Sequence, residues 1–297
     1  MTSVTTKGTS AVTSKLLRKA GFARKARASR VKIWTGAALT LVVVLPIVFV
    51  RSLPIPSASE QGLAERMLPP LTDGHLFGTD QLGRDLLARV MYGGQVSLLI
   101  GVLAVVISGT IGIILGSLAG YYGGKVDGII SRLIEAQLSL PLLMMLLLVV
   151  ALFGSSIPVI TFVIAIANWP EPARLTRSLV MVEREKPYVE AARVLGVKRL
   201  GVLVKHVLPN VIAQAIVVVL LLLAQAVLLE SALSFLGAGP QRPFPTWGRI
   251  ISDGQDVITS AWWLVTLPGV VIASLVVGVN LLGDGLRDFS RRKKASQ

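Results

Sequence analysis

The stretch QVSLLIGVLAVVISGTIGIILGSLAGY, residues Gln95–Tyr121, carries no charged side chain. A helix needs roughly 20 mostly apolar residues to cross the hydrocarbon core of a bilayer. Lipid offers no partner for backbone N–H and C=O groups, so a run of this kind must pair them within itself as a helix. The stretch therefore predicts a membrane-spanning helix and places the chain among membrane proteins.

Five further apolar runs predict spanning helices on the same grounds. They are Ile33–Val50, Leu133–Phe153, Ile157–Leu179, Val211–Gly237 and Trp262–Gly283. The composition agrees, because 15% of the residues are charged, against about 25% in a typical soluble domain. The run from Ile33 is longer than the apolar core of a signal peptide, so we expect a retained span. The expected fold class is all-α, a polytopic membrane protein with six transmembrane helices.

The basic residues predict the orientation of these helices. Lys and Arg collect in the cytoplasmic loops of membrane proteins, and with six spans 24 of the 30 lie on the side that holds both termini. We therefore expect both termini in the cytoplasm, with basic tails at 1–32 and 285–297 and membrane lipid as a partner of the second. The net charge of +14 follows from this bias. No fold signature of nucleic-acid binding accompanies it, so nucleic acid is not an expected partner.

Several kinds of chemistry are not expected from this sequence. Without cysteine, the chain cannot form disulfides, Cys-ligated zinc sites or a catalytic thiol. His75 and His206 fall on opposite sides of the membrane in the predicted topology, so no metal site is expected. No Ser/His/Asp set converges on one side, and there is no phosphate-binding loop of the form G-x-x-x-x-G-K-[ST]. We expect a chain that is not an enzyme and binds no ATP itself.

Small residues recur every fourth position in the helix predicted over Gln95–Tyr121. They are Ser108, Gly112, Gly116 and Gly120. This spacing places them on one helix face, where small side chains let membrane helices approach closely. The stripe predicts an interface with another helix of this chain or with a partner subunit. The alternative is the glycine enrichment common to membrane helices. Tyr121 and Tyr122, at the inner end, are typical of interfacial anchors.

Glu230 is the one ionisable residue inside the predicted spans away from their ends. A carboxylate is costly in hydrocarbon, so it should face protein or water. One interpretation is a contact along a solute pathway or with a partner subunit. The other is a structural residue bonded to backbone near Ser231 and Ser234. An ion-coupled carrier would need a second intramembrane carboxylate or His, which the sequence does not offer.

The predicted external loop, Arg51–Gly94, is long for a membrane protein. Thr79 or Asp80 would suit the N-cap of a short helix that ends near Tyr92, with Asp85 and Arg89 paired on its surface. The loop is either a surface for an extracytoplasmic partner or an ordered loop without one. The residues expected to make an external contact are Asp80, Arg84 and Asp85.

The segment EREKPYVEAARVLGVKRLGVLVKHVLPN, Glu183–Asn210, predicts two short helices between the fourth and fifth spans. Pro187 suits the opening turn of the first, Tyr188–Leu195, and Gly196 follows where a left-handed helix terminus favours glycine. The second is predicted over about Leu200–Val207. Its apolar face would consist of Leu200, Leu203, Val204 and Val207.

This segment resembles the EAA loop of binding-protein-dependent ABC importers. The family pattern is E-A-A, three residues, G, nine residues, then I-x-L-P. Here it reads Glu190-Ala191-Ala192, three residues, Gly196, nine residues, then His206-Val207-Leu208-Pro209, so His206 replaces the Ile.

Three further stretches resemble the C-type permease subunit of dipeptide and oligopeptide importers. They are GTDQLGRDLLARVMYGGQVSLLIG (Gly78–Gly101), LAGYYGGKVD (Leu118–Asp127) and LLESALSFLGAG (Leu228–Gly239). Nickel importers share much of this pattern. The likeness covers most of the chain after about residue 30.

The resemblance implies the type I ABC importer permease fold, located in the bacterial cytoplasmic (inner) membrane. It divides the chain into the tail 1–32, a first helix 33–50, an external loop 51–94 with a short helix, a permease domain 95–284 with the EAA loop at about 183–209, and the tail 285–297. The implied ATPase-docking residues are Glu190, Ala191, Ala192, Arg193, Gly196, Leu208 and Pro209. Gly112, Gly116, Gly120 and Glu230 remain candidates for the pathway or a subunit interface.

The resemblance also implies the function and partners of the chain. It would form half of a translocation pathway for peptides, with a sister permease subunit as the other half of a heterodimer. One or two cytoplasmic ATPase subunits would bind ATP and Mg²⁺, and an extracytoplasmic binding protein would deliver the solute. The alternatives are a nickel or other small-solute permease of the same family, and an ion-coupled secondary carrier.

Overall fold

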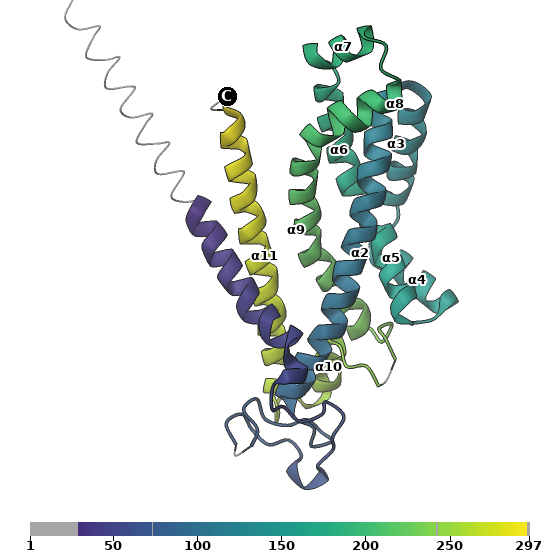
Figure 1. Cartoon of the computed structure of the whole chain (residues 1–297). Helices are drawn as coiled ribbons and strands as arrows, with labels where there is room; N and C mark the ends of the chain where they lie inside the picture. The colour runs from purple at the N-terminus through teal and green to yellow at the C-terminus, as the bar shows by residue number, and fades with distance from the viewer. Residues whose placement is uncertain (1–28, 73, 242, 296–297) are drawn as a thin grey trace, which may run out of the picture.

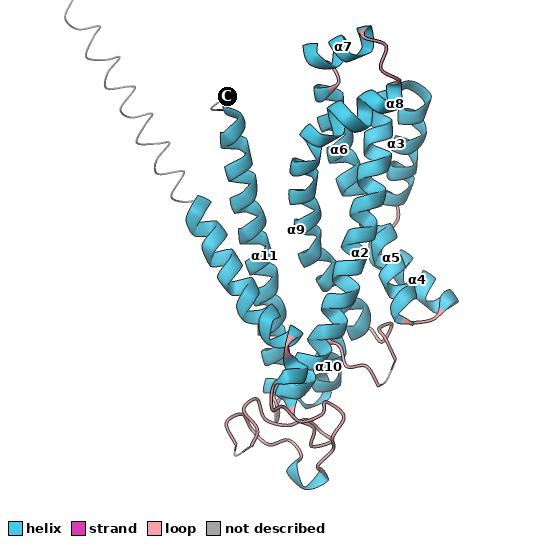
Figure 2. Cartoon of the chain, viewed as in Figure 1, coloured by secondary structure: helices cyan, strands magenta, loops and turns pink. Residues whose placement is uncertain are grey.

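The structure, a computed structural model, describes residues 29–72, 74–241 and 243–295. Across these ranges the regular secondary structure is helical and no strand is present (Figure 2). This agrees with the predicted all-α class. Of the predicted basic tail 1–32, residues 1–28 lie outside the described residues.

Among the described residues, four helices are long and apolar enough to cross a membrane. They are Ser29–Val48, α2 (Leu86–Tyr122), the continuous helix Arg199–Phe235 that ends in α9 (Leu208–Phe235), and the Trp263–Asp288 part of α11 (Trp263–Ala295). They coincide with the first, second, fifth and sixth predicted spans. If the bent helix pair described below is one span, the number of candidate spans is five. Helix length and composition therefore do not by themselves establish the six predicted spans.

Helix α2 begins earlier than predicted. Asp85 is its N-cap, and its Oδ1 accepts a hydrogen bond of 2.7 Å from the backbone N–H of Ala88. The short loop helix predicted to end near Tyr92 and the span predicted from Gln95 are therefore one helix. The preceding loop ends at Asp85 rather than Gly94, and neither Thr79 nor Asp80 is the cap.

The third predicted span, Leu133–Phe153, is not a continuous helix. It is divided between α3 (Gly124–Leu138) and α4 (Leu142–Phe153), which are bent by 88° relative to each other. Pro141 lies in the break. A proline lacks the backbone N–H of a helix interior, and it disfavours helical geometry in the residue before it, here Leu140.

The fourth predicted span, Ile157–Leu179, is also divided. Helix α5 (Ile157–Asn168) has 12 residues, and α6 (Pro170–Glu183) has 14. Pro170 occupies the first turn of α6, where its missing N–H is not needed. Neither helix alone reaches the length of a transmembrane helix, roughly 20 residues.

Helix α2 lies beside α6 and α9, and α9 also contacts α11, because a Cβ on Gly283 of α11 would lie 2.2 Å from the Leu221 side chain of α9. The Ser29–Val48 helix and α11 lie side by side and form a second close pair (Figure 1). The second pair approaches closely at two glycines, because a Cβ on Gly36 would lie 2.7 Å from the carbonyl oxygen of Gly278. Small residues of this kind permit close helix packing.

The two ends of the molecule carry different elements (Figure 1). Short α7 (Pro187–Val194) and α8 (Arg199–Val202) lie at one end, which we call the α7 end. Helix α10 (Trp247–Gly254) and the loop 49–85 lie at the other, which we call the α10 end. The loop contains the 3₁₀ turns Val50–Ser52 and Leu63–Glu65, and a third turn, Gln255–Val257, follows α10.

Candidate functional site

Helix α7 is anchored by one buried face. Lys186 is its N-cap and Pro187 stands in its first turn, as predicted. The side chains of Val189 and Ala192 are buried in a cluster formed with α2, α6 and α9. The other members of this cluster are Tyr121, Val180, Val202, Leu203, Val207 and Val211. The short helix is therefore fixed to the longer helices rather than free.

The opposite face of α7 is exposed and partly apolar. Val194 and Leu195 are each 82% exposed, and Glu190 and Ala191 are exposed beside them. Burying apolar surface contributes about 25 cal/mol per Å², so this face would gain stability by contact with another protein. We call Glu190, Ala191, Val194 and Leu195 the α7 face.

Gly196 ends α7 in a left-handed conformation, with φ of +81°. Its N–H donates to the carbonyl of Arg193 at 3.0 Å, and the N–H of Val197 donates to the carbonyl of Ala192 at 3.2 Å. These two bonds form a Schellman motif, whose central position favours glycine. The local prediction for Gly196 is confirmed, and no neighbouring atom restricts it, because a Cβ there would meet nothing within 4 Å.

The second predicted helix differs from the structure. Regular α8 ends at Val202, and Leu203–Val207 forms a π-helical turn in which the N–H of Leu208 bonds to the carbonyl of Leu203. A π turn adds one residue to the turn and so rotates the face that is buried. Val202, Leu203 and Val207 are buried, whereas the predicted face members Leu200 and Val204 are exposed.

The remaining predicted docking residues lie close to α7. Leu208 begins α9 and Pro209 stands in its first turn, so both continue the helix rather than interrupt it. Arg193 is exposed, and its guanidinium carbon lies 5.6 Å from the ring centroid of Tyr121. This is within the distance at which a cation is attracted to an aromatic face.

A polar network that the sequence does not predict connects α7 to α6 and α9. The carboxylate of buried Glu183, the last residue of α6, accepts from Tyr188 Oη at 2.7 Å and from Lys186 Nζ at 2.8 Å. Asn210 Nδ2 donates to Tyr188 Oη at 3.0 Å. Burial, together with the hydrogen bond to Glu183, raises the pKa of Tyr188 to about 12, so the phenol remains a donor at neutral pH.

The small-residue stripe packs against α6 of the same chain. A Cβ on Gly116 would lie 2.3 Å from the carbonyl oxygen of Ala173, and one on Gly120 would lie 2.6 Å from that of Arg177. A Cβ on Gly112 would lie 2.6 Å from the Pro172 ring. The sequence left open whether the stripe contacts another helix of this chain or a partner subunit. In the structure it contacts a helix of this chain, α6.

Glu230 lies inside the chain near the α10 end of α9. Its carboxyl group is fully buried, and Oε1 accepts a hydrogen bond of 2.6 Å from Ser234 Oγ. Helix α10 is directly beside it, because a Cβ on Gly248 would lie 2.0 Å from the carbonyl oxygen of Ser231. Glu230 therefore bonds to a side chain one helical turn away, and not to backbone as the structural interpretation expected.

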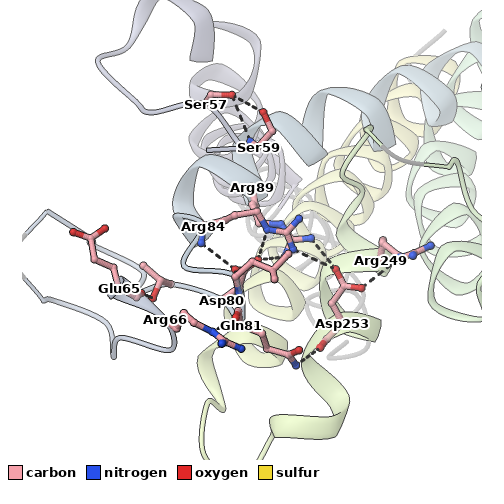
Figure 3. A network of polar contacts seen from close by, with 12 residues as sticks. Ser57, Ser59, Glu65, Arg66, Asp80, Gln81, Arg84, Arg89, Arg249 and Asp253 are labelled. Atoms are coloured by element: carbon pink, nitrogen blue, oxygen red, sulfur yellow. Dashed lines mark hydrogen bonds and ion pairs between the residues drawn. The ribbon is translucent and has the colours of Figure 1, made fainter. Parts of the chain in front are cut away.

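The α10 end is held by buried ion pairs (Figure 3). Arg89 donates from Nη1 to Asp80 at 2.6 Å and from Nη2 to Asp253 at 2.8 Å, so it joins the loop 49–85 to α10. Arg84 Nε donates to the same Asp80 carboxylate at 2.7 Å. Burial alone would raise the pKa of Asp80, but Arg89, hydrogen bonds from the backbone and Arg84 hold that pKa below its ordinary value.

The expected external contact therefore does not agree with the structure. Asp80 and Asp85 are buried, and Arg84 points toward Asp80 (Figure 3). The surface pair predicted between Asp85 and Arg89 is wrong, because Asp85 Oδ2 instead bonds to His75 Nδ1 at 2.8 Å. These residues stabilise the α10 end through contacts within the chain.

Comparisons with known proteins agree on one family. The model of the "binding-protein-dependent transport system inner membrane component" family matches residues 112–296. The chain is 42% identical over 213 residues to the di/tripeptide transport system permease protein DppC of Pseudomonas aeruginosa, covering 72% of this chain and 70% of that protein. It is 40% identical over 220 residues to the oligopeptide transport system permease protein OppC of Escherichia coli, covering 74% and 73%.

Two more comparisons extend this result. The dipeptide transport system permease protein DppC of Bacillus subtilis is 38% identical over 233 residues, covering 78% of this chain and 72% of that protein. Among solved structures, one described as an amino acid ABC transporter with histidines superposes with a TM-score of 0.52 at 21% identity. That match covers 69% of this chain and 94% of the other, and at this identity it supports the fold alone.

Proposed function

The chain belongs to the binding-protein-dependent transport system inner membrane components, and we propose that the solute it helps to carry is a peptide. It is a membrane-spanning permease subunit of an ATP-binding-cassette importer. Curated relatives that match over more than two thirds of their length are named for dipeptides, di/tripeptides or oligopeptides. A dipeptide or oligopeptide is therefore the solute class best supported.

We propose that the α7 face docks on a cytoplasmic ATPase subunit. The support is that Val194 and Leu195 stand exposed on a helix whose other side is fixed in the protein. An exposed apolar patch on an otherwise anchored element is typical of an interaction surface. In this arrangement the ATPase subunit binds ATP and Mg²⁺ and catalyses the hydrolysis. This chain responds by a conformational change.

The contacts of α7 suggest how movement would pass into the membrane. Closure of the ATPase pair would shift α7, and the Tyr188 hydroxyl connects α7 to Glu183 on α6 and Asn210 on α9. Helix α6 in turn packs on α2 through the glycine stripe. A packed, two-state set of helices of this kind can open a pathway alternately to each side.

We further propose six membrane crossings with both termini in the cytoplasm. The support is the basic bias of the sequence together with one contact: Gln241 Nε2 donates to Ser155 Oγ at 3.0 Å. That bond places the α4–α5 turn beside the loop that precedes α10, away from α7 (Figure 1). The pairs α3–α4 and α5–α6 would then be the third and fourth crossings, each broken near a proline.

The expected assembly follows from the family. A sister permease subunit would complete the pathway as a heterodimer, one or two ATPase subunits would bind at the α7 end, and a solute-binding protein would meet the opposite face. The location would be the bacterial cytoplasmic (inner) membrane.

The docking proposal is tested by enlarging one residue of the α7 face. In the assembled transporter, Ala191→Leu adds bulk to an exposed position, so we expect it to reduce peptide uptake and peptide-stimulated ATP hydrolysis by about tenfold or more, as when roughly 1.4 kcal/mol is lost. Val204→Leu is the matched control, because Val204 is exposed outside the α7 face. Normal coupling in Ala191→Leu would refute the docking assignment.

The solute is tested separately. Proteoliposomes that contain the full transporter and its binding protein should accumulate labelled dipeptides or oligopeptides when supplied with ATP. Accumulation of Ni²⁺ instead, with no peptide uptake, would overturn the peptide assignment while leaving the permease function intact.

A further inference from the structure

A cavity of about 500 Å³ lies between α7 and the end of α2. The polar and aromatic residues that line it are Arg184, Arg193, Arg199, Glu185, Tyr121 and Tyr122. Three guanidinium groups face one carboxylate, so the cavity carries net positive charge. The cavity adjoins α7 but lies apart from Ala191, Val194 and Leu195 of the α7 face.

Arg184 is held in this cavity by the end of α2. Its Nη1 donates to the carbonyl oxygens of Gly120 at 2.7 Å and Tyr121 at 3.2 Å, and its Nε donates to Glu185 at 2.9 Å. The negative end of the α2 dipole therefore favours the Arg184 charge. Within the described residues, Nη2 of Arg184 has no hydrogen-bond partner, so two N–H donors remain for a ligand.

The other two arginines bring charge without a carboxylate partner. Arg193 is held over the Tyr121 ring and donates a long hydrogen bond of 3.4 Å to the carbonyl of Arg184. Arg199, at the start of α8, makes no ion pair among the described residues. Gathered like charges repel one another, and an anion placed between them would remove that repulsion.

The length of α2 indicates where the cavity lies in the membrane. The whole helix, Leu86–Tyr122, rises about 56 Å at 1.5 Å per residue, which exceeds the roughly 40–45 Å thickness of a bilayer with its headgroups. With its first turn and the ion-paired Arg89 in the aqueous loop at the α10 end, its other end reaches the opposite headgroup region. The exposed Tyr122 then lies at the headgroup level, where tyrosines are enriched. An anion that a bilayer supplies at that depth is a lipid phosphate.

We propose that this cavity binds the phosphate of an anionic membrane lipid in the cytoplasmic leaflet. Arg184, Arg193 and Arg199 bind the headgroup, and the exposed Tyr122 ring borders it. Because these side chains come from both sides of the cavity, a bound lipid holds α7 and α8 against the end of α2. The anionic lipid content of the membrane would thereby influence how readily the coupling segment moves.

The inference rests on the proposed cytoplasmic placement of the α7 end, but its test does not involve an ATPase. The full chain is purified in detergent, and binding of phosphatidylglycerol and of phosphatidylcholine with the same acyl chains is measured by native mass spectrometry. We expect one phosphatidylglycerol to bind roughly thirtyfold more tightly than phosphatidylcholine, the effect of about two basic residues near an anionic headgroup.

The variant pair separates this site from general attraction to positive charge. Arg193→Gln with Arg199→Gln should bring phosphatidylglycerol binding down to the phosphatidylcholine level. Arg132→Gln with Lys205→Gln removes the same charge at exposed positions outside the cavity and should leave the preference unchanged. Far-ultraviolet and near-ultraviolet circular dichroism check that each pair of substitutions leaves the chain folded.

Three results would overturn the proposal. They are equal binding of the two lipids, an unchanged preference in the Arg193/Arg199 variant, and displacement of phosphatidylglycerol by soluble glycerol phosphate, which would assign the cavity to a soluble anion. None of these results bears on the coupling test at Ala191, so failure of one proposal is distinguishable from failure of the other.

Discussion

Single residues carry much of the stability at the α10 end, where Asp80 and Arg89 pair with side chains only 3% and 4% exposed. Asp80→Asn leaves the Arg89 charge without its most buried partner, and removal of one member of a buried pair costs about 3–5 kcal/mol. Asp253→Asn should cost less, because Asp253 is 29% exposed and Arg89 retains Asp80.

The order of these two effects is the measurable outcome. Thermal unfolding of the purified chain in detergent should give a lower midpoint for Asp80→Asn than for Asp253→Asn. Arg51→Gln, which alters an exposed basic residue of the same loop, serves as the control with little effect. Equal midpoints for the two aspartate variants would contradict the role given to burial.

His75 gives the α10 end a pH dependence. Its hydrogen bond to Asp85, opposed by burial and aided by Glu65, raises the pKa of His75 above its ordinary value of 6.5. A raised pKa means that the protonated form stabilises the fold below the ordinary value, and that this contribution is lost as the pH rises through the folded value.

The expected observation concerns the difference between the parent chain and His75→Gln. The gap between their unfolding midpoints should be larger at about pH 6 than at about pH 9, because the charge that stabilises the parent is lost at alkaline pH. A gap that stays constant or widens with pH would show that the imidazolium contributes nothing.

At this scale the sequence predicted what is local and missed what is distant. Pro187 and Gly196 were placed correctly because the start and end of a short helix depend on a few neighbouring residues. The Arg89–Asp253 bond joins residues 164 positions apart, and no local pattern indicates such a pair. The same limit explains why Asp85 was assigned to Arg89 four residues away instead of to His75.

At the scale of helices, the close approach of the α2 and α6 backbones gives a testable prediction. A Cβ on Gly116 would lie 2.3 Å from a backbone oxygen of α6, and backbone cannot move aside as a side chain can. Gly116→Ala should therefore destabilise the chain by about 1–3 kcal/mol, the usual cost of overpacking. The matched control is Gly128→Ala in α3, where an added Cβ meets nothing within 4 Å.

The comparison of these two variants distinguishes packing from propensity. Alanine is favoured over glycine in a helix by up to about 1 kcal/mol, so Gly128→Ala should leave the unfolding midpoint unchanged or raise it. Gly116→Ala should lower it despite the same gain in propensity. If both variants are equally stable, α2 and α6 do not approach as closely as the structure indicates.

Helix boundaries show where apolar content misleads. Two apolar stretches suggest unbroken helices, Leu133–Phe153 and Ile157–Leu179. Each is interrupted beside a proline that is visible in the sequence, Pro141 in the first and Pro170 in the second. Hydrophobicity reports that a segment is buried in lipid or protein, whereas backbone chemistry decides whether it continues as a helix. The π turn at Leu203–Val207 has no comparable sequence signal.

For the molecule as a whole, the class followed from the length of the apolar runs and the family from the EAA spacing, because both are properties of the chain order itself. How the helices pair did not follow, since helix rotation depends on contacts between distant segments. The Gly36–Gly278 approach between the first helix and α11 is one such contact. Neither glycine stood out in the sequence.

The number of crossings can be decided with single cysteines, because the natural sequence contains none. Ser156→Cys and Leu195→Cys place thiols at two exposed positions, the α4–α5 turn and the α7 face. Six crossings put residue 156 outside and residue 195 inside. Four crossings put both inside, and five, with α3–α4 as one span, put both outside.

We expect a membrane-impermeant maleimide to label intact cells at position 156, whereas position 195 should react only after permeabilisation. Glu60→Cys, in the exposed loop before α2, is the external control. Labelling of position 195 from outside would remove α7 from the reach of a cytoplasmic ATPase and with it the proposed mechanism of coupling.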